Sequence, residues 1–397
     1  MKIGVDYLSI NPSYKGGVST YAFGLLDGLL AVNKNNIQYI VFIKSKDKLF
    51  YKEYLNNNNL NVIIVNHRPI LKKMLLIVPY FLSSIFLWEK AVNVYAKITG
   101  IKKLIENNCD ILYTPTTVLN FYNLAVPTLL SMHDIQQFHY PEYFSNRELK
   151  LRRLTFTNSS KFATYFQASS QFIMNDLLEH FPHIREKQII VIPEGVTIKR
   201  FKIKNNVKIK EKYNLPDDFL FFPAQLWKHK NHITVLKALK KIEINGLKIP
   251  LVMTGAKYSA SNDIFSYIAE NEMDYIYYLG VVEFNDLVAL YQEACFFITA
   301  ALYESSSLSI LESAASNRPI ISSKTPPNIE MSENLKIYMF SPLNVNDCAN
   351  VITNCWNFSS RDISDITNNN AANIDYYSWE NTAEKYINFI TKEVNIA

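Results

Sequence analysis

The feature of the sequence that most constrains the fold is a regular alternation of short apolar runs with longer stretches of helical period. The short runs are rich in β-branched and aromatic residues and are bounded by turn residues, as buried strands are. The longer stretches leave room for helices that cross from one strand to the next. The alternation therefore predicts an α/β chain with parallel sheets.

This alternation runs through the chain twice, which predicts two doubly wound domains. Between the two series, residues 193–218 break the rhythm with lysines, asparagines and a proline, as a linker or a surface crossing would. Two such domains that face each other would place a ligand cleft between the carboxyl ends of their strands. The predicted strands are Lys2–Asp6, Tyr39–Ile43, Val62–Val65, Ile111–Tyr113, Thr128–Met132, Tyr165–Ala168 and Ile189–Ile192, then Phe219–Phe222, Leu251–Thr254, Ile276–Leu279, Phe296–Thr299, Ile320–Ser322 and Tyr338–Phe340.

Helices are predicted between these strands, and an amphipathic helix follows an asparagine-rich tract near the C-terminus. The predicted helices are Val18–Leu30, Val94–Glu106, Arg147–Thr157, Gln171–Phe181, His232–Asn245, Phe284–Glu293, Ser309–Ser316, Val345–Trp356 and Trp379–Glu393.

The chain of 397 residues suits two domains of ordinary size, and its 48% hydrophobic and 19% charged residues describe a globular protein with substantial cores. A net charge of +5 is mild, so nucleic acid is not required as a partner. Anionic small molecules or an acidic membrane surface would suit it equally well. The four cysteines show neither metal-ligand spacing nor the density of a disulfide scaffold, which favours a reducing, cytosolic setting. They are Cys109, Cys295, Cys348 and Cys355.

The N-terminal sequence MKIGVDYLSI lacks the basic head and long apolar run of a signal peptide and predicts a buried strand. The longest apolar segment, residues 74–88, is shorter than the roughly 20 residues that a spanning helix needs, and it contains Pro79. Aromatic residues within it and lysines on both sides are typical of a segment in a lipid headgroup layer. The alternative is burial in the core of the N-terminal domain. The flanking lysines are Lys72, Lys73, Lys90 and Lys97.

Two motifs in the first half place polar groups where a strand gives way to a loop. Gly16 and Gly17 open a predicted helix, where backbone N–H groups can meet an anion or a hydroxyl, although paired glycines also serve in tight turns. His133 and Asp134 follow directly after the apolar strand TLLSM. The neutral His133 ring could hydrogen-bond a sugar hydroxyl or a developing charge, and the alternative is a structural histidine. His139, further along, is expected to shape the loop.

A third motif places Lys228, His229 and Lys230 immediately before a predicted helix. Cations at a helix N-terminus are unfavourable by the helix dipole alone. Their placement makes sense if an anion lies between them and the free N–H groups of the helix. Lysines on a solvated turn are the alternative.

The fourth motif is YESSSLSILESAA, residues 303–315, in which Glu304 and Glu312 stand two helical turns apart with serines between them. A serine at a helix entrance can cap the free N–H groups, and the N–H groups themselves can bind an anion. Glu304 in the loop and Glu312 in the helix could then flank a bound ligand. As isolated residues they would be solvated surface glutamates.

Together these motifs resemble the retaining glycosyltransferases of family four, which have the two-domain GT-B fold. The resemblance covers nearly the entire chain and rests on the order and spacing of short motifs. These are the glycines at 16–17, the His-Asp pair at 133–134, VIPEGV at 191–196, LWKHKNH at 226–232, the two glutamates of the fourth motif, and YYSWENTAEKYI at 376–387.

The resemblance implies three parts of the chain. Residues 1–198 would form a Rossmann-like acceptor-binding domain, and residues 199–375 a Rossmann-like domain that binds the nucleotide-sugar donor. Residues 376–397 would form a C-terminal helix that packs back toward the N-terminal domain.

The same resemblance implies roles for individual residues. Lys230, with His229 as a further candidate, would neutralise the nucleotide diphosphate, which the N–H groups around residues 307–309 would cap. Glu312 would bind the ribose hydroxyls and Glu304 the donor sugar. The implied catalytic residues are His133, beside the transferred sugar, Glu304 and Lys230; the implied donor-binding residues are Gly17, His229, Lys230, Glu304, Ser307, Leu308, Ser309 and Glu312; the implied acceptor-binding residues are Gly16 and Asp134.

No cofactor and no divalent metal are expected, because lysine and helix dipole would stabilise the leaving diphosphate. The chain departs from the family pattern at Ser305 and Ser307, where the family has glycine, and at Gln225, where it commonly has arginine. The added side chains would narrow the donor pocket, and the missing arginine would leave fewer fixed charges on the diphosphate.

The implied activity is transfer of a hexose, with retention, from a nucleotide diphosphate sugar such as GDP-mannose to a lipid-linked or growing bacterial polysaccharide of the lipopolysaccharide O-antigen type. The implied location is cytoplasmic, either free or attached peripherally to the cytoplasmic face of the inner membrane, with no nucleic-acid partner. Two alternatives remain open. One is a sugar-nucleotide epimerase of the same fold, and the other is a non-catalytic scaffold that binds nucleotide sugars.

Overall fold

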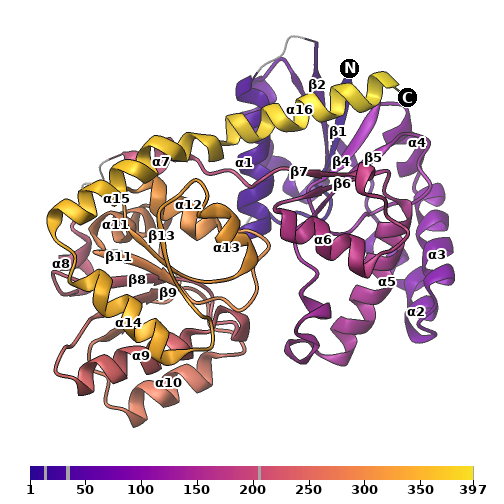
Figure 1. Cartoon of the computed structure of the whole chain (residues 1–397). Helices are drawn as coiled ribbons and strands as arrows, with labels where there is room; N and C mark the ends of the chain where they lie inside the picture. Colours follow the sequence, from indigo (N-terminus) through magenta and orange to yellow (C-terminus); the bar gives the residue numbers. More distant parts are fainter. Residues whose placement is uncertain (13–15, 33–35, 204–206, 397) are drawn as a thin grey trace. The chain divides into compact units, whose positions relative to one another are not determined.

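The computed structural model of the protein describes residues 1–12, 16–32, 36–203 and 207–396 (Figure 1). Residues 13–15 of the loop before the paired glycines and residues 204–206 of the expected linker lie outside the described residues. The chain forms two compact units: unit 1 comprises Met1–Gly195 and Trp379–Ala397, and unit 2 comprises Val196–Ser378. The boundaries expected from the sequence, after residues 198 and 375, each lie three residues from these.

Unit 1 contains a seven-stranded sheet in the order β3-β2-β1-β4-β5-β6-β7. All of its strand pairs are parallel, as the crossover pattern predicts. Its strands are β1 (Lys2–Asp6), β2 (Gln38–Lys44), β3 (Leu60–Val65), β4 (Ile111–Thr114), β5 (Thr128–Met132), β6 (Tyr165–Ala168) and β7 (Ile189–Val191).

Helices of unit 1 cover this sheet, and two separate apolar clusters fill the space between helices and sheet. The helices are α1 (Gly17–Val32), α2 (Pro69–Phe81), α3 (Ile85–Ile98), α4 (Ile101–Glu106), α5 (Asn146–Phe162), α6 (Gln171–His180) and α16 (Trp379–Ile396), with short 3₁₀ turns η1 (Ser45–Tyr51), η2 (Glu53–Asn56), η3 (Gln136–Phe138), η4 (Pro141–Tyr143) and η5 (Glu186–Gln188).

Unit 2 contains a six-stranded parallel sheet in the order β10-β9-β8-β11-β12-β13. Figure 1 shows helices on both of its faces, with α9, α10 and α14 on one and α11 and α12 on the other, each set packed on its own apolar cluster. The strands are β8 (Leu220–Pro223), β9 (Leu251–Thr254), β10 (Ile276–Tyr278), β11 (Phe296–Thr299), β12 (Ile320–Ser323) and β13 (Ile337–Phe340). The helices are α7 (Ile198–Lys202), α8 (Ile209–Tyr213), α9 (His232–Ile244), α10 (Ser261–Glu270), α11 (Phe284–Glu293), α12 (Leu308–Ala315), α13 (Pro326–Met331), α14 (Val345–Trp356) and α15 (Ser360–Asn373), with 3₁₀ turns η6 (Lys228–Lys230) and η7 (Ile374–Tyr377).

The strand order of each sheet changes direction once. In unit 1 the change falls between the neighbours β1 and β4, and in unit 2 between the neighbours β8 and β11. The loops that leave the carboxyl ends of two such strands diverge to opposite faces, which opens a crevice where α/β proteins bind ligands. The switch point of each sheet is therefore the place to look for a site.

Helix α16 belongs to unit 1 although it ends the chain. Its first residue, Trp379, lies against Gly24 and Gly28 of α1 and against Gly195, where any added Cβ would come within 2.2–2.6 Å of Trp379 atoms. Further along, the hydroxyl of Tyr386 hydrogen-bonds the buried hydroxyl of Tyr21 on α1. Small residues on α1 thus make room for the aromatic residues of α16.

The apolar segment at residues 74–88 forms the end of α2 and the start of α3. Among the described residues, no helix combines the length and the apolar character that crossing a bilayer requires. Six of its large side chains are exposed, so the alternative of core burial is wrong for these six, whereas Pro79 and Trp88 are buried. The exposed large apolar residues of this hairpin are Ile70, Met74, Ile77, Val78, Phe81, Leu82, Phe86, Val94 and Ile98.

Candidate functional site

Lys230 and Glu304 form an ion pair at the switch point of unit 2. Lys230 ends η6, the turn after β8, and Glu304 lies in the loop after β11, so two neighbouring parallel strands bring the side chains to the same edge of the sheet. Lys230 Nζ lies 2.7 Å from Glu304 Oε1, and the two side chains are 24% and 11% exposed. A lysine held in place in this way can stabilise an anion with little reorganisation.

Hydrogen bonds to backbone carbonyls hold the two loops together beside this ion pair. The N–H of Leu302 donates to the carbonyl of His229 at 2.7 Å, and the Asn231 side chain donates to the carbonyl of Ala300 at 3.1 Å. Asn231 has a φ of 56°, in the left-handed region that asparagine tolerates better than most residues. It lets the chain leave η6 and enter α9 within one residue.

His229 is uncharged in this setting. Burial and the neighbouring Lys230 charge lower the pKa of His229 to about 3. The sequence suggested His229 as a second group that could neutralise a diphosphate. The low pKa keeps the ring neutral, so the positive charges of this turn are those of Lys230 and of Lys228, which is exposed.

Helix α12 begins beside Glu304, and its entrance is lined by serines. Ser307 is 2% exposed, and its hydroxyl hydrogen-bonds the Ser309 hydroxyl at 3.2 Å. Within the described residues, the Ser307 side chain makes no capping hydrogen bond to α12, and its φ is −113°. The serine at this position therefore keeps ordinary backbone geometry and leaves the helix end uncapped by its side chain, as an anion site requires.

Glu312 lies one turn into α12 and is paired with Tyr291 of α11. The Tyr291 hydroxyl donates to Glu312 Oε2 at 2.8 Å and also lies 3.4 Å from the Ser309 carbonyl. Burial raises the pKa of Glu312 to about 7, and the hydrogen bond from Tyr291 opposes that rise. Near neutral pH Glu312 is therefore divided between its carboxylate and its carboxylic acid.

Gln225, at the position where arginine was noted as common, has a partner in the same loop. Its side-chain oxygen accepts a hydrogen bond from the Trp227 indole N–H at 2.9 Å. Trp227 in turn stacks on Tyr258 with ring centroids 3.8 Å apart. Gln225 thus orients an aromatic pair beside η6.

His133 lies at the carboxyl end of β5 in unit 1 and is 7% exposed. Its Nε2 lies 2.9 Å from the carbonyl of Pro115, and its Nδ1 lies 3.4 Å from Glu194 Oε1. The Tyr21 ring of α1 meets His133 edge-on, with centroids 4.4 Å apart. These contacts fix the position of the ring. His133 therefore has the structural role that the sequence offered as an alternative, and this does not exclude a role in a reaction.

The remaining sequence-predicted residues of unit 1 lie near this histidine in the chain or on α1. Gly17 is the first residue of α1, and a Cβ added there would meet nothing within 4 Å. Gly16 accepts a hydrogen bond from Thr20 N–H at 3.0 Å. Asp134 accepts from Gln136 N–H at 2.7 Å, which turns the chain into η3.

The sequence did not single out three side chains that complete these environments. Tyr291 is the partner of Glu312, Glu194 faces His133, and Tyr21 packs on the His133 ring. Glu194 stands inside the VIPEGV motif, three residues after the end of β7, so a buried charged residue just beyond a strand offered a signal. Tyr21 and Tyr291 sit on helical faces whose other residues are apolar, where an aromatic residue is indistinguishable from core.

Part of the chain is similar in sequence to known glycosyltransferases. Residues 203–357 match the family model described as glycosyl transferases group 1. Over 211 residues the chain is 26% identical to the O-antigen chain mannosyltransferase RfbU of Salmonella typhimurium. That match spans 53% of this chain and 56% of RfbU, about half the length of each.

Solved structures share the fold over nearly the whole chain. The crystal structure of Anabaena Alr3699/HepE in complex with UDP and glucose matches with a TM-score of 0.71 and 15% identity, covering 99% of this chain and 100% of that one. A glycosyltransferase from Rickettsia africae ESF-5 matches with a TM-score of 0.70 and 19% identity, covering 99% of this chain and 98% of that one. The predicted GT-B fold, with its two Rossmann-like parallel-sheet domains, is confirmed, and the match to the glycosyl transferases group 1 model is confined to residues 203–357 of unit 2.

Proposed function

We propose that the chain is a retaining glycosyltransferase that moves a hexose from a nucleotide diphosphate sugar to a lipid-linked or growing bacterial polysaccharide. The observation that carries the proposal is the meeting of Lys230, Glu304 and the uncapped entrance of α12 at the switch point of unit 2. A cation and a helix N-terminus together suit a diphosphate. The group 1 family match covers these same residues.

In this proposal each donor-site residue binds a different part of the nucleotide sugar. Lys230 stabilises the charge that develops on the leaving diphosphate, and the N–H groups at Ser307, Leu308 and Ser309 bind its oxygens. Glu312, kept in place by Tyr291, accepts hydrogen bonds from the ribose hydroxyls. These groups supply positive potential without a divalent cation, so the transfer needs no metal.

The remaining assignments concern the sugar and the acceptor. Glu304 and His133 act on the transferred hexose, Gly17 leaves space for the donor, and Gly16 with Asp134 contacts the acceptor. Mannose is the preferred sugar because the curated relative is named an O-antigen chain mannosyltransferase, while the UDP and glucose of the Anabaena structure make UDP-glucose the donor to compare it with.

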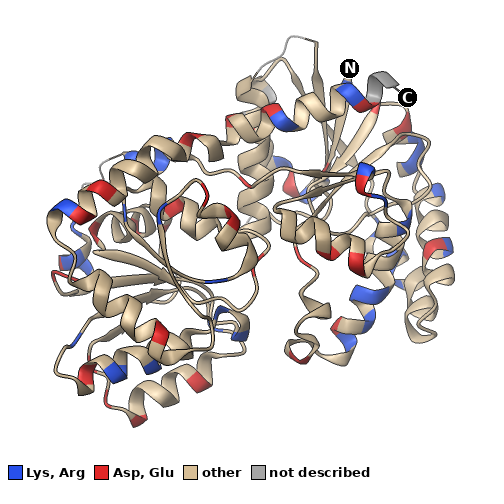
Figure 2. Cartoon of the chain, viewed as in Figure 1, with Lys and Arg blue, Asp and Glu red and all other residues tan. Residues whose placement is uncertain are grey.

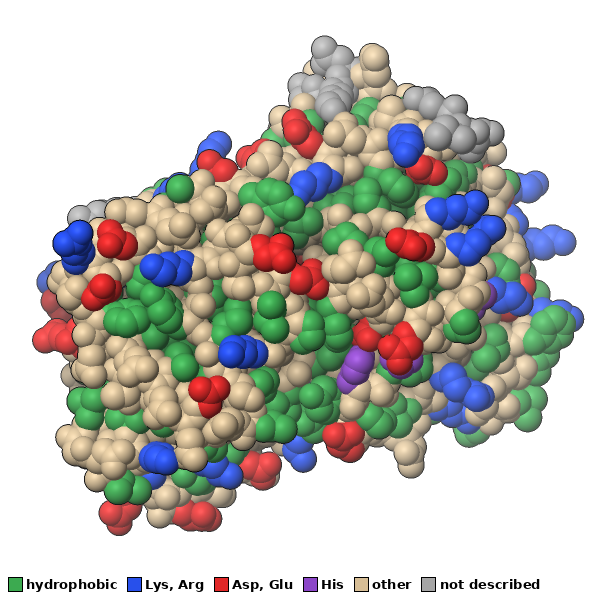
Figure 3. Space-filling model, in the orientation of Figure 1, with side chains coloured by type: hydrophobic (Ala, Val, Ile, Leu, Met, Phe, Trp, Pro, Cys, Tyr) green, Lys and Arg blue, Asp and Glu red, His purple; other side chains and the backbone are tan. Residues whose placement is uncertain are grey.

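The acceptor would be presented at the cytoplasmic leaflet of a membrane, to which the hairpin α2–α3 attaches peripherally. Figure 3 shows hydrophobic and basic side chains next to each other along the right-hand edge of unit 1, where Figure 1 places α2 and α3. Figure 2 shows further basic positions on α3, α4 and α5. Exposed apolar residues with lysines around them are typical of segments at an anionic lipid surface.

Helix α5 fixes the tip of this hairpin. Lys150 Nζ donates to the Phe81 carbonyl and Arg153 donates to the Ser83 carbonyl, both at 3.0 Å. These bonds satisfy carbonyl groups at and just beyond the end of α2, where the helical hydrogen bonds stop. Pro79 lies in the last turn of α2, and Ser83, which follows the helix, has a left-handed φ of 53°. The apolar side chains are thus held outward on a fixed support.

A panel of nucleotide sugars tests the proposal through thermal shift. A bound donor at about 100 times its dissociation constant stabilises the protein by about 2.7 kcal/mol. We expect one nucleotide diphosphate sugar to raise the melting temperature of the wild type and of Lys228→Ala, whose lysine lies on the same turn but is exposed. Lys230→Ala should lose that ligand-induced shift.

Four results would overturn the proposal in different ways. An absence of any shift across the panel removes the donor site. A shift that Lys230→Ala retains in full places the diphosphate elsewhere. Donor binding without transfer to any acceptor favours the scaffold, and consumption of donor without acceptor favours the epimerase.

A further inference from the structure

Three side chains with metal-binding chemistry come together in unit 1, and the proposed transfer uses none of them. They are His139, Asp176 and His180, and one ligand atom from each lies within 4.8 Å of the others. Within the described part of the chain, no other group of three or more histidine, cysteine, aspartate or glutamate residues meets this condition.

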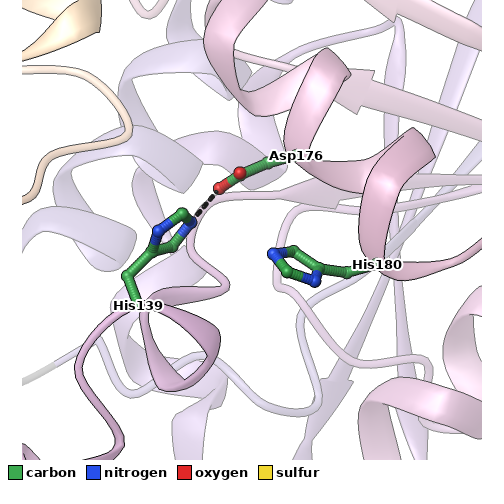
Figure 4. Close-up of side chains that lie close together, drawn as sticks. All are labelled: His139, Asp176 and His180. Atoms are coloured by element: carbon green, nitrogen blue, oxygen red, sulfur yellow. Dashed lines mark hydrogen bonds and ion pairs between the residues drawn. The ribbon is translucent and has the colours of Figure 1, made fainter.

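The fold brings these residues together from two elements. Asp176 and His180 are four residues apart on α6 and therefore lie on one face of that helix. His139 comes from the loop between η3 and η4, where its own N–H donates to the Gln136 carbonyl at 3.0 Å. Figure 4 shows His139 reaching from this loop toward Asp176, with the His180 ring beside them.

We propose that His139, Asp176 and His180 bind a divalent transition-metal ion of the zinc class. His139 Nε2 already lies 2.7 Å from Asp176 Oδ2. Zinc binds histidine nitrogen and carboxylate oxygen at roughly 2.0–2.2 Å, so ligand atoms around it stand about 3.3–3.6 Å apart. Shifts of little more than about 1 Å in the imidazoles would convert the present cluster into a coordination shell.

The burial of each residue is consistent with its role as a metal ligand. Asp176 is a carboxylate with 5% of its side chain exposed, so it is held in place and gains from a cation nearby. The His139 side chain is 30% exposed, which lets water complete the coordination. His180 lies in the last turn of α6, where the helix dipole also favours a cation.

The ligand set selects the kind of metal. Two imidazoles and one carboxylate suit zinc and its neighbours among the transition metals, whereas magnesium and calcium prefer shells of oxygen. The ion would join α6 to the loop that follows His133 and Asp134. Its ligands lie in unit 1, whereas the residues proposed to hold the diphosphate lie in unit 2, so the ion stabilises a loop and leaves the transfer itself independent of metal.

The cluster also has a metal-free explanation that the test must separate. His139 and Asp176 make an ordinary hydrogen-bonded pair, and His180 stacks on Phe138 with ring centroids 4.2 Å apart and an interplanar angle of 6°. In that case each histidine is satisfied by its own neighbour. Zinc would then bind no more tightly than at any exposed histidine.

Calorimetric titration with zinc chloride distinguishes a zinc site from a metal-free cluster. The protein is the full chain, without a histidine tag and stripped of metal. We expect one zinc per chain, with affinity lowered at least tenfold in His139→Ala and in His180→Ala. His183→Ala is the matched control, because His183 is an exposed histidine three residues beyond α6. The zinc affinity of this variant should stay within twofold of wild type. Magnesium should not compete.

A second readout guards against variants that lose zinc by losing structure. Cobalt in place of zinc gives visible absorption that reports a shell of nitrogen and oxygen ligands, and the metal-free melting temperatures show whether His139→Ala and His180→Ala fold. We expect folded variants without the cobalt bands. The proposal is overturned if the wild type shows no saturable zinc binding, or if folded variants bind zinc and cobalt as the wild type does.

Discussion

Glu312 is the residue whose protonation most directly controls the proposed donor site. Its pKa is about 7, because burial disfavours the carboxylate more than Tyr291 stabilises it. A carboxylate accepts hydrogen bonds at both oxygens, whereas the protonated acid has lost part of that capacity. We therefore predict that nucleoside diphosphate binds more weakly as the pH falls from about 8 to about 6.

Glu312→Gln is the control for this prediction, because the diphosphate itself also titrates in that range. The glutamine keeps the shape and an acceptor for Tyr291 but cannot ionise. The ratio of variant to wild-type affinity, measured by calorimetry, should approach one as the pH falls. A ratio that stays constant with pH would show that Glu312 does not titrate at the ligand.

Glu304 should behave differently from Glu312, because its partner in the structure is Lys230. Removing the carboxylate in Glu304→Ala frees Lys230 for the diphosphate, so affinity for the free nucleoside diphosphate should be kept or improved. Turnover should fall at least about tenfold, since an interaction with the sugar is lost in the transition state. Calorimetry beside a transfer assay tests this, and equal loss of nucleotide affinity in Glu304→Ala and Glu312→Ala would refute the division.

At the level of secondary-structure elements, α1 packs closely against α16 through its glycines. An alanine Cβ at Gly28 would come within 2.3 Å of the Trp379 backbone oxygen, whereas one at Gly17 meets nothing within 4 Å. We expect Gly28→Ala to destabilise the protein by about 1–3 kcal/mol through overpacking. Gly17→Ala should be neutral or slightly stabilising, and a Gly28→Ala melting temperature at or above wild type would contradict this packing.

The hairpin α2–α3 carries the prediction about the membrane. Co-sedimentation with anionic vesicles at low salt should occur for the wild type and drop several-fold in the double variant Met74→Ser, Phe81→Ser, whose side chains are 67% and 70% exposed. Ile244→Ser is the matched control, because Ile244 is 75% exposed on α9 of unit 2. Failure of the wild type to sediment, or equal loss in the control, would exclude α2–α3 as the attachment surface.

Strands were more predictable from the sequence than helices, for a physical reason. A strand buried on both faces is a short apolar run, and all thirteen strands of the described residues coincide with such runs to within two residues at either end. Helix α15 was missed because its asparagines resemble a polar loop, although Ser359 and Asp362 form a capping box at its start. The predicted helix Val94–Glu106 is wrong in one respect: Gly100, with φ of 71°, divides α3 from α4.

Site residues were predictable where chain order alone brings them to a strand end, and not where partners come from other elements. Lys230 meets Glu304 because β8 pairs in parallel with β11. This meeting was predictable, because each motif follows directly after a predicted strand. The neutral state of His229 depends on burial among distant residues, which no local pattern reports. The meeting of His139 with α6 depends on tertiary packing in the same way.

For the molecule as a whole, the proposed reaction is acceptor-dependent transfer of a hexose. The two units supply what such a reaction needs separately: unit 2 a cation and an open helix end for the diphosphate, and unit 1 a buried, oriented histidine at its own sheet edge. A nucleotide-binding scaffold could keep the first of these, and an epimerase would act on the donor without an acceptor.

The most direct test follows the anomeric carbon by NMR while the full chain acts on GDP-mannose, with UDP-glucose in parallel, and a lipid-linked glycan acceptor. We expect a glycoside whose anomeric configuration matches that of the donor and which forms only when acceptor is present. A chelator should leave the rate of transfer unchanged, and Lys230→Ala should reduce it at least about a hundredfold. An inverted product, donor consumption without acceptor, or undiminished transfer by Lys230→Ala would contradict the proposed reaction.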